Sequence, residues 1–279
     1  MSFNNQQTLA LSTVHTPIAL TIAGSDSGGG AGIQADLKTF AALGVYGCSA
    51  ITSLTAQNTT GVQGVLPIPP DFVRAQIESV LSDISVGAIK TGMLATAEIT
   101  NVVVEILNVY WTIPLVLDPV MVATSGDRLL ANDAIDVLIK KLMPRATIIT
   151  PNLWEAAALL NVSVAQNQVQ IEQQAAHLLA LGAQAVLMKG GHAQGREATD
   201  FLLTHNEQFT FSTLRIMTKN THGTGCTLAA AIAAGLAKKL SLQESIAQAK
   251  DYLQNALIHS DQLHVGTGAG PVHHFYQYY

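Results

Sequence analysis

The sequence predicts an α/β sandwich in which a mainly parallel sheet lies between layers of helices. Short apolar runs alternate with longer amphipathic segments along the 279 residues, which is typical of strands and helices that follow one another in the chain. Several apolar runs do not alternate with polar residues, as expected for parallel strands that helices cover on both faces. We therefore expect strands at residues 18–23, 47–54, 86–90, 115–117, 147–150, 185–188, 198–203 and 208–213.

Helical patterns fill the intervals between these strands. They cover residues 30–43, 71–81, 96–110, 132–141, 152–160, 171–181, 225–236 and 242–260. A three-residue connection, 205–207, joins the last two strands, which predicts a hairpin at an edge of the sheet. Residues 1–16 are polar and are expected to form a loose tail. Because no Pro/Gly/Ser-rich linker follows, residues 17–279 are expected to form a single domain.

Composition and charge exclude several classes of protein. The chain is 48% hydrophobic and 12% charged, with a formal net charge of −5, so a disordered chain or a nucleic-acid-binding surface is not expected. Its two cysteines, Cys48 and Cys226, do not form a disulfide framework. The N-terminus lacks the features of a signal peptide, and no apolar stretch is long enough to span a membrane. We therefore expect a cytoplasmic protein without a membrane partner.

The first candidate site is AGSDSGGGAGIQADLKTF at residues 23–40. Glycines allow a ligand to approach the backbone closely. However, neither the dinucleotide fingerprint nor the Walker A pattern is satisfied. The glycines therefore indicate either a ligand loop or a strained turn, and Asp36 is either a substrate contact or a surface acid. Further along, Gln57 and Asn58 follow a strand, and such amides suit the edge of a heterocycle, although a simple polar turn fits the segment equally.

Polar side chains also follow three later strands. Asp118 and Glu155 can hold Mg²⁺ largely through water, but Asn152 with Glu155 also fits a helix-capping pattern. Lys189 leaves a strand beside a Gly-Gly pair and can meet phosphate oxygens, or it can be an ordinary exposed lysine.

The segment NTHGTGC, residues 220–226, begins a predicted helix. Gly223 and Gly225 leave backbone N–H groups free to bind an anion. A thiol at this position, Cys226, is expected to have a lowered pKa. His222 can assist it or be a plain loop residue.

Together and in this order, these stretches resemble the hydroxymethylpyrimidine/phosphomethylpyrimidine kinases of the ribokinase-like superfamily. The resemblance rests on the segments quoted above and on TAQNT, KTGML, LDPVM with TSGDRLL, TPNL, LMKGGH and GPVHH. It implies a ribokinase-like three-layer sandwich, a homodimer, and phosphorylation of 4-amino-5-hydroxymethyl-2-methylpyrimidine and of its monophosphate with ATP and Mg²⁺, in thiamine biosynthesis.

The resemblance also implies roles for individual residues. Gln57 would bind the aminopyrimidine edge, in a pocket lined by Gly24, Asp36 and Met93. Asp118 and Glu155 would lie on the metal side. The catalytic group would consist of Lys189, Gly223, Gly225 and Cys226, with the cysteine as the base.

Two departures and two alternatives accompany this interpretation. Sugar kinases of the superfamily carry Gly-Ala-Gly-Asp where this chain has Gly-Thr-Gly-Cys, which favours the pyrimidine kinases. Trp154 stands where the family often has proline, which weakens the assignment of Glu155 to the metal. A pyridoxal/pyridoxine kinase is the first alternative, and a non-catalytic ligand-binding protein of the same fold is the second.

Overall fold

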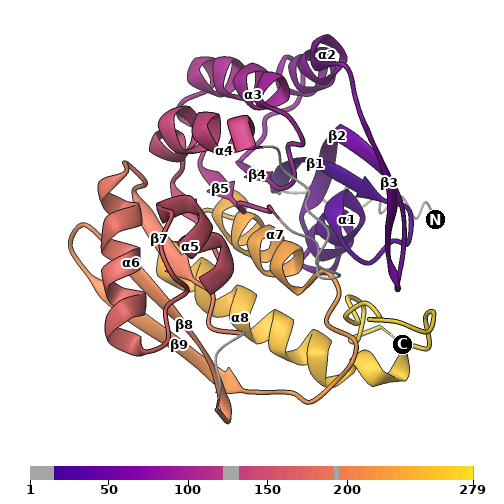
Figure 1. Cartoon of the computed structure of the whole chain (residues 1–279). Coiled ribbons are helices and arrows are strands. Elements are labelled where there is room, and N and C mark those ends of the chain that lie inside the picture. The colour runs from indigo at the N-terminus through magenta and orange to yellow at the C-terminus, as the bar shows by residue number, and fades with distance from the viewer. Residues whose placement is uncertain (1–15, 122–131, 192–194, 279) are drawn as a thin grey trace, which may run out of the picture.

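A single mixed sheet organises the molecule. The computed structural model describes residues 16–121, 132–191 and 195–278. Within these residues the sheet has nine strands in the order β3-β2-β1-β4-β5-β6-β7-β8-β9. Strands β2, β1, β4, β5, β6 and β7 lie side by side in this order and are parallel to one another. Strand β3 pairs antiparallel with β2, β8 with β7, and β9 with β8. Figure 1 shows the sheet between two layers of helices, so the predicted fold class is confirmed.

The bounds of the elements are as follows. The strands are β1 (Ile18–Asp26), β2 (Tyr46–Asn58), β3 (Gly61–Pro67), β4 (Ala88–Thr91), β5 (Leu115–Leu117), β6 (Ile148–Ile149), β7 (Ala185–Met188), β8 (Glu197–Thr204) and β9 (Gln208–Leu214). The longer helices are α1 (Gly32–Ala42), α2 (Pro70–Leu81), α3 (Ala97–Val109), α4 (Asn132–Val137), α5 (Leu153–Leu160), α6 (Gln168–Ala180), α7 (Thr224–Ala237) and α8 (Leu242–Ile258).

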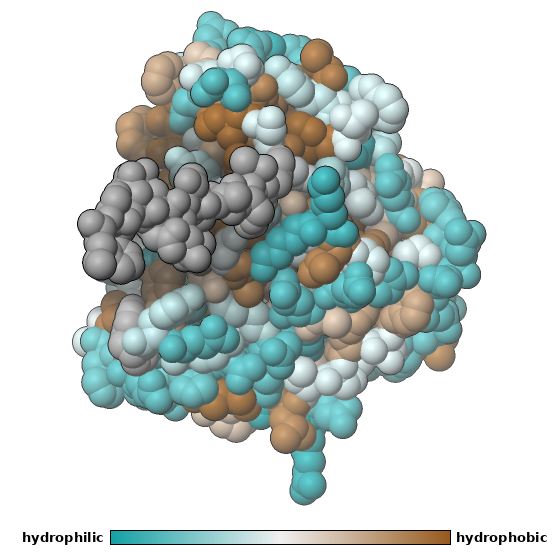
Figure 2. Space-filling model, turned by 180° about the vertical axis from the view of Figure 1, so that it is seen from behind, coloured by the Kyte–Doolittle hydropathy of each residue, from teal (hydrophilic) through white to brown (hydrophobic). Residues whose placement is uncertain are grey.

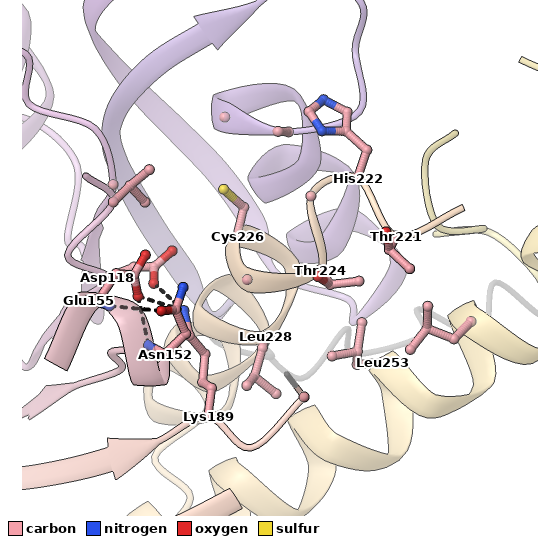
Figure 3. A pocket seen from close by; sticks show the side chains of 18 of the residues that line it. Asp118, Asn152, Glu155, Lys189, Thr221, His222, Thr224, Cys226, Leu228 and Leu253 are labelled. Atoms are coloured by element: carbon pink, nitrogen blue, oxygen red, sulfur yellow. Dashed lines mark hydrogen bonds and ion pairs between the residues drawn. The ribbon is translucent and has the colours of Figure 1, made fainter. Parts of the chain in front are cut away.

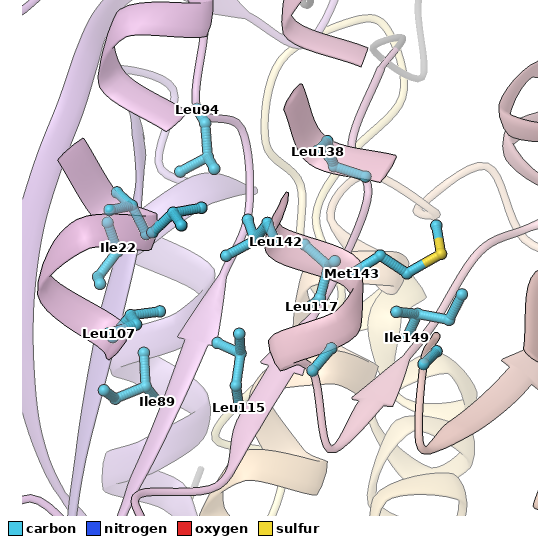
Figure 4. Close-up of a cluster of buried hydrophobic side chains, with 14 of the residues drawn as sticks. Ile22, Ile89, Leu94, Leu107, Leu115, Leu117, Leu138, Leu142, Met143 and Ile149 are labelled. Carbon is cyan, nitrogen blue, oxygen red and sulfur yellow. The ribbon is translucent and has the colours of Figure 1, made fainter. Parts of the chain in front are cut away.

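Each face of the sheet has its own hydrophobic core. On one face, strand residues such as Ile22, Ile89 and Leu115 pack against α2 to α6 and the turns around Leu142 and Met143 (Figure 4). On the other face, the alternate strand residues pack against α1, α7 and α8. Both faces are therefore apolar, which explains why the strands read as unbroken apolar runs in the sequence.

Helix α7 is the central element of the second layer, and its small side chains explain its position. Ten of its residues are buried, and most of them are alanines. A Cβ at Gly235 would lie only 2.6 Å from Oγ of Ser245 in α8, so glycine allows the two helices to come close together. Because α7 packs against β1, β4 and β5, its N-terminus is carried to the carboxyl ends of those strands.

The structure corrects several predicted elements. Strand β3 was not predicted: residues 59–60 form a tight turn after β2, and the chain returns as an edge strand. The predicted helix at 132–141 is α-helical only to Val137, and a π-helical turn and a 3₁₀ turn continue it to Arg145. The predicted β8–β9 hairpin at the sheet edge is confirmed.

Within the described residues, no helix combines the length and the apolar character that crossing a membrane requires. On the face in Figure 2, hydrophilic residues cover most of the lower half, and hydrophobic residues gather mainly in the upper part. The tail predicted for residues 1–16 lies outside the described residues except for Thr16, and the single domain at 17–279 stays a prediction.

Candidate functional site

The carboxyl ends of the parallel strands surround one cavity of about 670 Å³. Strand β1 is the point where the chain reverses direction across the sheet, since β2 lies on one side of it and β4 on the other. Ligands of open α/β sheets bind beyond the strand ends at such a point, and the volume suits a small-molecule site. Segments following β1, β2, β4, β5, β6 and β7 all contribute to the wall, together with the start of α7.

Gly24 and Met93 form part of the wall at the ends of β1 and β4. A Cβ at position 24 would lie 2.6 Å from Cε of Met93 and 2.8 Å from Oγ of Ser53. Glycine is therefore required for the methionine side chain to lie flat against β1. The structure thus brings these two predicted pocket residues together, on the same side of the cavity as Gln57.

Asp26, at the end of β1, organises the glycine-rich loop. Its carboxylate accepts hydrogen bonds from the amides of Gly28 (2.8 Å), Gly30 (3.0 Å) and Ala31 (2.8 Å). Burial acts to raise the pKa of Asp26, but the hydrogen bonds from His222 and from these amides outweigh it and hold the pKa below its usual value. The sequence predicted that this helix begins at Gly30. Because Asp26 binds the loop amides in this way, α1 begins at Gly32 instead.

Asp36 lies behind the cavity wall and does not line it. The residue is fully buried in α1, and both of its oxygens lie 2.9 Å from Nζ of Lys90, while Thr21 donates a hydrogen bond of 2.6 Å to it. This placement corrects the expectation that Asp36 contacts the substrate. It holds Lys90 instead, and Lys90 does line the cavity.

Lys90 carries a positive charge into the centre of the site. Burial acts to lower the pKa of its ammonium group, but the negative charges of Asp36 and Asp118 outweigh it and raise the pKa. Lys90 begins the KTGML segment, and no role was predicted for it from the sequence. A lysine inside an otherwise apolar strand was the signal that could have identified it.

Lys189 joins the two predicted metal-side carboxylates. Its Nζ lies 2.8 Å from Oδ1 of Asp118 and 3.6 Å from Oε2 of Glu155. Burial raises the pKa of the Glu155 carboxyl, and the charge of Lys189 opposes this. In Figure 3 these three side chains gather on one side of the pocket, beside Asn152.

The capping interpretation of Asn152 and Glu155 is confirmed, and it leaves room for a metal role. Asn152 accepts from the Glu155 amide (2.8 Å), and Glu155 accepts from the Asn152 amide (2.7 Å). Trp154, which replaces the family's usual proline, does not prevent this cap and is 65% exposed at the cavity.

The carboxylates fit a Mg²⁺ ion that protein atoms hold at few points. In the described part of the chain, no cluster of three or more acidic, histidine or cysteine side chains is arranged to bind a metal. Among the described residues, Asp118 and Glu155 are the two carboxylates that line this part of the cavity beside Lys189. Mg²⁺ retains several waters and commonly takes one or two carboxylates together with substrate phosphates, so this donor set suits it.

The start of α7 is open towards these charges. Gly223 has a φ of 81°, and a Cβ there would lie 1.9 Å from the carbonyl oxygen of Gly30, so glycine allows α7 to dock on the glycine-rich loop. A Cβ at Gly225 would lie 3.3 Å from Nζ of Lys189. In the described residues, the amides of Gly225 and Cys226 have no protein acceptor. These amides and the helix dipole are suited to an anion.

The prediction of a lowered pKa for Cys226 is wrong. The side chain is half-buried in the first turn of α7, between the Asp118–Glu155–Lys189 group and His222 (Figure 3). Burial raises the pKa of the thiol to about 11, and the charge of Lys90 offsets only part of this. At neutral pH Cys226 is therefore a thiol.

His222 and Gln57 meet at the end of the cavity that contains Gly24 and Met93. Nε2 of His222 lies 2.8 Å from Oδ2 of Asp26 and 3.3 Å from the side-chain nitrogen of Gln57. Gln57 was predicted from the sequence, but its neighbour Asp26 was not, because the two residues are 31 positions apart in the chain and β1–β2 pairing brings them together.

A group of apolar residues in the cavity wall was not predicted from the sequence. The apolar residues are Leu228 of α7, Leu253 and Leu257 of α8, Leu214 at the end of β9 and Ile216 just after β9, and the lining there also contains Arg215 and Gln254. The apolar residues carry no distinctive chemistry in the sequence, so no motif pointed to them. The TSGDRLL segment and His192 lie outside the described residues.

Comparison with known proteins agrees with the site. The sequence model described as phosphomethylpyrimidine kinase matches residues 26–273. The hydroxymethylpyrimidine/phosphomethylpyrimidine kinase of Escherichia coli is 52% identical over 261 residues, 94% of this chain and 98% of that protein. A phosphomethylpyrimidine kinase structure from Clostridium difficile 630 has a TM-score of 0.76 at 44% identity, covering 86% of this chain and 98% of that one.

A pyridoxal kinase is also structurally similar. The ADP complex of the Bacillus subtilis enzyme has a TM-score of 0.86 at 38% identity, covering 93% of this chain and 97% of the other. The sequence-based prediction of a kinase of the hydroxymethylpyrimidine type is confirmed by the relatives above. The chain belongs to the phosphomethylpyrimidine kinase family.

Proposed function

We propose that this kinase transfers the γ-phosphoryl group of ATP to 4-amino-5-hydroxymethyl-2-methylpyrimidine and then phosphorylates the monophosphate to the diphosphate. The observation that carries the proposal is the single cavity in which an amide, Gln57, faces one end, a free helix N-terminus and two lysines lie in the middle, and an apolar region forms the other end. Such an arrangement can hold a heterocycle, a phosphoryl group and a nucleobase in line.

The heterocycle binds at the end that contains Gln57. The amide can both donate and accept hydrogen bonds, as the ring nitrogen and the exocyclic amine of an aminopyrimidine require. Met93 and Gly24 form an apolar surface on which the flat ring can lie. This position directs the hydroxymethyl group towards the first turn of α7.

The nucleotide binds at the other end. Leu228, Leu253 and Leu257 provide an apolar surface for adenine, since bases are flat and largely apolar on their faces. The related pyridoxal kinase from Bacillus subtilis was solved with ADP, which supports a nucleotide in this fold. The triphosphate would then extend towards Lys189 and Gly225.

Transfer depends on positioning and on charge stabilisation. The amides of Gly225 and Cys226 would hold the transferring phosphoryl oxygens, and Lys189 and Lys90 would compensate their negative charge. Asp118 and Glu155 would hold Mg²⁺, which supplies further charge compensation at the phosphates.

We also propose that the enzyme is cytoplasmic and forms a homodimer. The absence of a disulfide framework and the family resemblance support these two statements. Size-exclusion chromatography with light scattering tests the second.

The proposed function is tested by coupled measurement of ADP release with each heterocycle. We expect a higher kcat/KM with the aminopyrimidine alcohol than with pyridoxal, and formation of the diphosphate from the monophosphate. A marked preference for pyridoxal would favour the pyridoxal kinase alternative. No ATP consumption with either compound, while binding persists in calorimetry, would favour the non-catalytic protein.

Cys226 is proposed to accept the proton of the substrate hydroxyl as transfer completes, and its raised pKa predicts a particular pH profile. Since the thiolate is the accepting form and the thiol pKa is about 11, kcat/KM should increase by roughly tenfold per pH unit above neutrality until the pKa is approached. Cys226→Ala should lose this slope and about 10²–10⁴-fold in rate at high pH. Cys48→Ala, a buried cysteine outside the cavity, serves as the control. A flat wild-type profile would reject the base role.

A further inference from the structure

The hydrogen bonds around His222 determine which way the Gln57 amide points. His222 lies in the loop before α7, and its backbone amide donates to the carbonyl of Gly270 (3.0 Å). Its ring packs so closely on the glycine-rich loop that a Cβ at Gly30 would lie 2.3 Å from Cδ2. The ring is therefore held in place, with Nε2 between Asp26 and Gln57.

The contact with Asp26 determines that Nε2 of His222 carries a hydrogen. The Asp26 side chain is 3% exposed, and its Oδ2, 2.8 Å from Nε2, also accepts from two loop amides. A carboxylate in that position can only accept, so Nε2 of His222 must carry a hydrogen. This holds for the neutral ring and for the protonated ring alike. Nε2 consequently has no lone pair to offer to Gln57.

Two contacts of the Gln57 amide then conflict if its nitrogen faces His222. Two hydrogen-bearing nitrogens would lie 3.3 Å apart. With the nitrogen facing His222, the Gln57 side-chain oxygen faces Thr55. Oγ1 of Thr55 then lies 2.9 Å from the carbonyl oxygen of Ser25 and 3.1 Å from the Gln57 oxygen, but it has only one hydrogen to donate to these two acceptors. Turning the amide by 180° places its oxygen, and not a second N–H, beside the Nε2–H of His222, and it ends the double use of the Thr55 hydrogen, because the O and N positions of a side-chain amide are assigned from its partners.

We propose that Asp26 and His222 act as positioning residues that orient the Gln57 amide. They thereby determine which hydrogen-bond donor and which acceptor the pocket presents to its substrate. In this orientation the single Nε2 hydrogen of His222 is donated to Asp26 and is shared with the Gln57 oxygen, while one amide hydrogen is donated to Thr55, which in turn donates to Ser25. One lone pair and one N–H of Gln57 remain for the substrate. They are complementary to an amine next to an unprotonated ring nitrogen. This inference rests on the proposed function, in which Gln57 contacts the pyrimidine.

The matched substrates for the test are the aminopyrimidine alcohol and its 4-oxo counterpart. The oxo compound replaces the amine by a carbonyl and carries a hydrogen on the neighbouring ring nitrogen, so its pattern is reversed. If the Gln57 amide is fixed, its oxygen faces the carbonyl of the oxo compound and its N–H faces the ring N–H, so neither group forms a hydrogen bond. We therefore expect the wild-type enzyme to prefer the amino compound by about 100-fold or more in kcat/KM.

Two variants of His222 separate orientation from simple packing. His222→Gln keeps an N–H donor near Asp26 and should retain most of the preference. His222→Met has a similar size without a donor, which frees the Gln57 amide to turn, and its preference should fall below about tenfold. If His222→Met keeps the wild-type preference, the orienting role is rejected. If wild-type enzyme phosphorylates neither compound, the proposed function itself is rejected.

A measurement on the unmodified enzyme covers the case in which His222→Met does not fold. The ¹⁵N shifts of the His222 ring, assigned by their loss in His222→Gln, report which ring nitrogen carries hydrogen. We expect Nε2 to be protonated across neutral pH. A neutral ring with hydrogen on Nδ1 alone would overturn the inference.

Discussion

Replacing Lys189 by methionine is expected to lower kcat/KM for the phosphorylation by about 10²–10³-fold, the usual cost of removing one preorganised charge from a transition state. The ammonium group lies 2.8 Å from Asp118 and 3.6 Å from Glu155, next to the open start of α7. Its loss leaves two buried carboxylates facing each other and removes the charge that would meet the phosphates. Steady-state kinetics with the aminopyrimidine alcohol at saturating ATP measure the effect.

Lys140→Met is the matched control for Lys189→Met. Lys140 forms an ion pair with Asp136, but both side chains are 69% exposed, and exposed pairs contribute little. This variant should keep activity within about twofold of wild type. If Lys189→Met behaved in the same way, the proposed contact between this lysine and the transferring phosphoryl group would be wrong.

The largest loss of stability is expected for Lys90→Met. Lys90 and Asp36 are both fully buried and joined by two contacts of 2.9 Å. Removing the lysine leaves the Asp36 charge without its partner, which typically costs about 3–5 kcal/mol. The free energy of unfolding, measured in urea at pH 7, should fall by this amount.

The double variant Lys90→Met/Asp36→Leu tests the reason for that loss. Replacing both members of a buried ion pair by apolar residues is often neutral for stability. We therefore expect the double variant to recover most of the unfolding free energy while remaining inactive, since Lys90 lines the cavity. A double variant as unstable as Lys90→Met would show that the cost comes from packing and not from the unpaired charge.

Local signals in the sequence were enough for much of the architecture. Apolar runs without alternation predicted the parallel strands because helices cover both faces of this sheet. The capping pattern at Asn152 and Glu155 and the hairpin β8–β9 depend on residues close together in the chain, and both are present. Strand β3 was missed because an exposed edge strand has little apolar pattern to reveal it.

The site required the tertiary structure wherever the environment of a group decides its chemistry. A helix N-terminus predicted a low pKa for Cys226, but burial in the cavity wall outweighs it. Asp36 had the appearance of a substrate contact, whereas packing places it under Lys90. His222 read as a plain loop residue, and only the docking of α7 on the glycine-rich loop brings it between Asp26 and Gln57.

The sequence by itself therefore determined the family, the chain order of all the strands and helices except β3, and the residue types that chemistry at the strand ends needs. Tertiary structure decided which of those residues face the cavity, which are paired beneath its wall, and which protonation states they hold. The physical reason is that periodicity and motifs are properties of neighbours in the chain, while burial and charge pairing depend on segments as distant as Asp26 and His222.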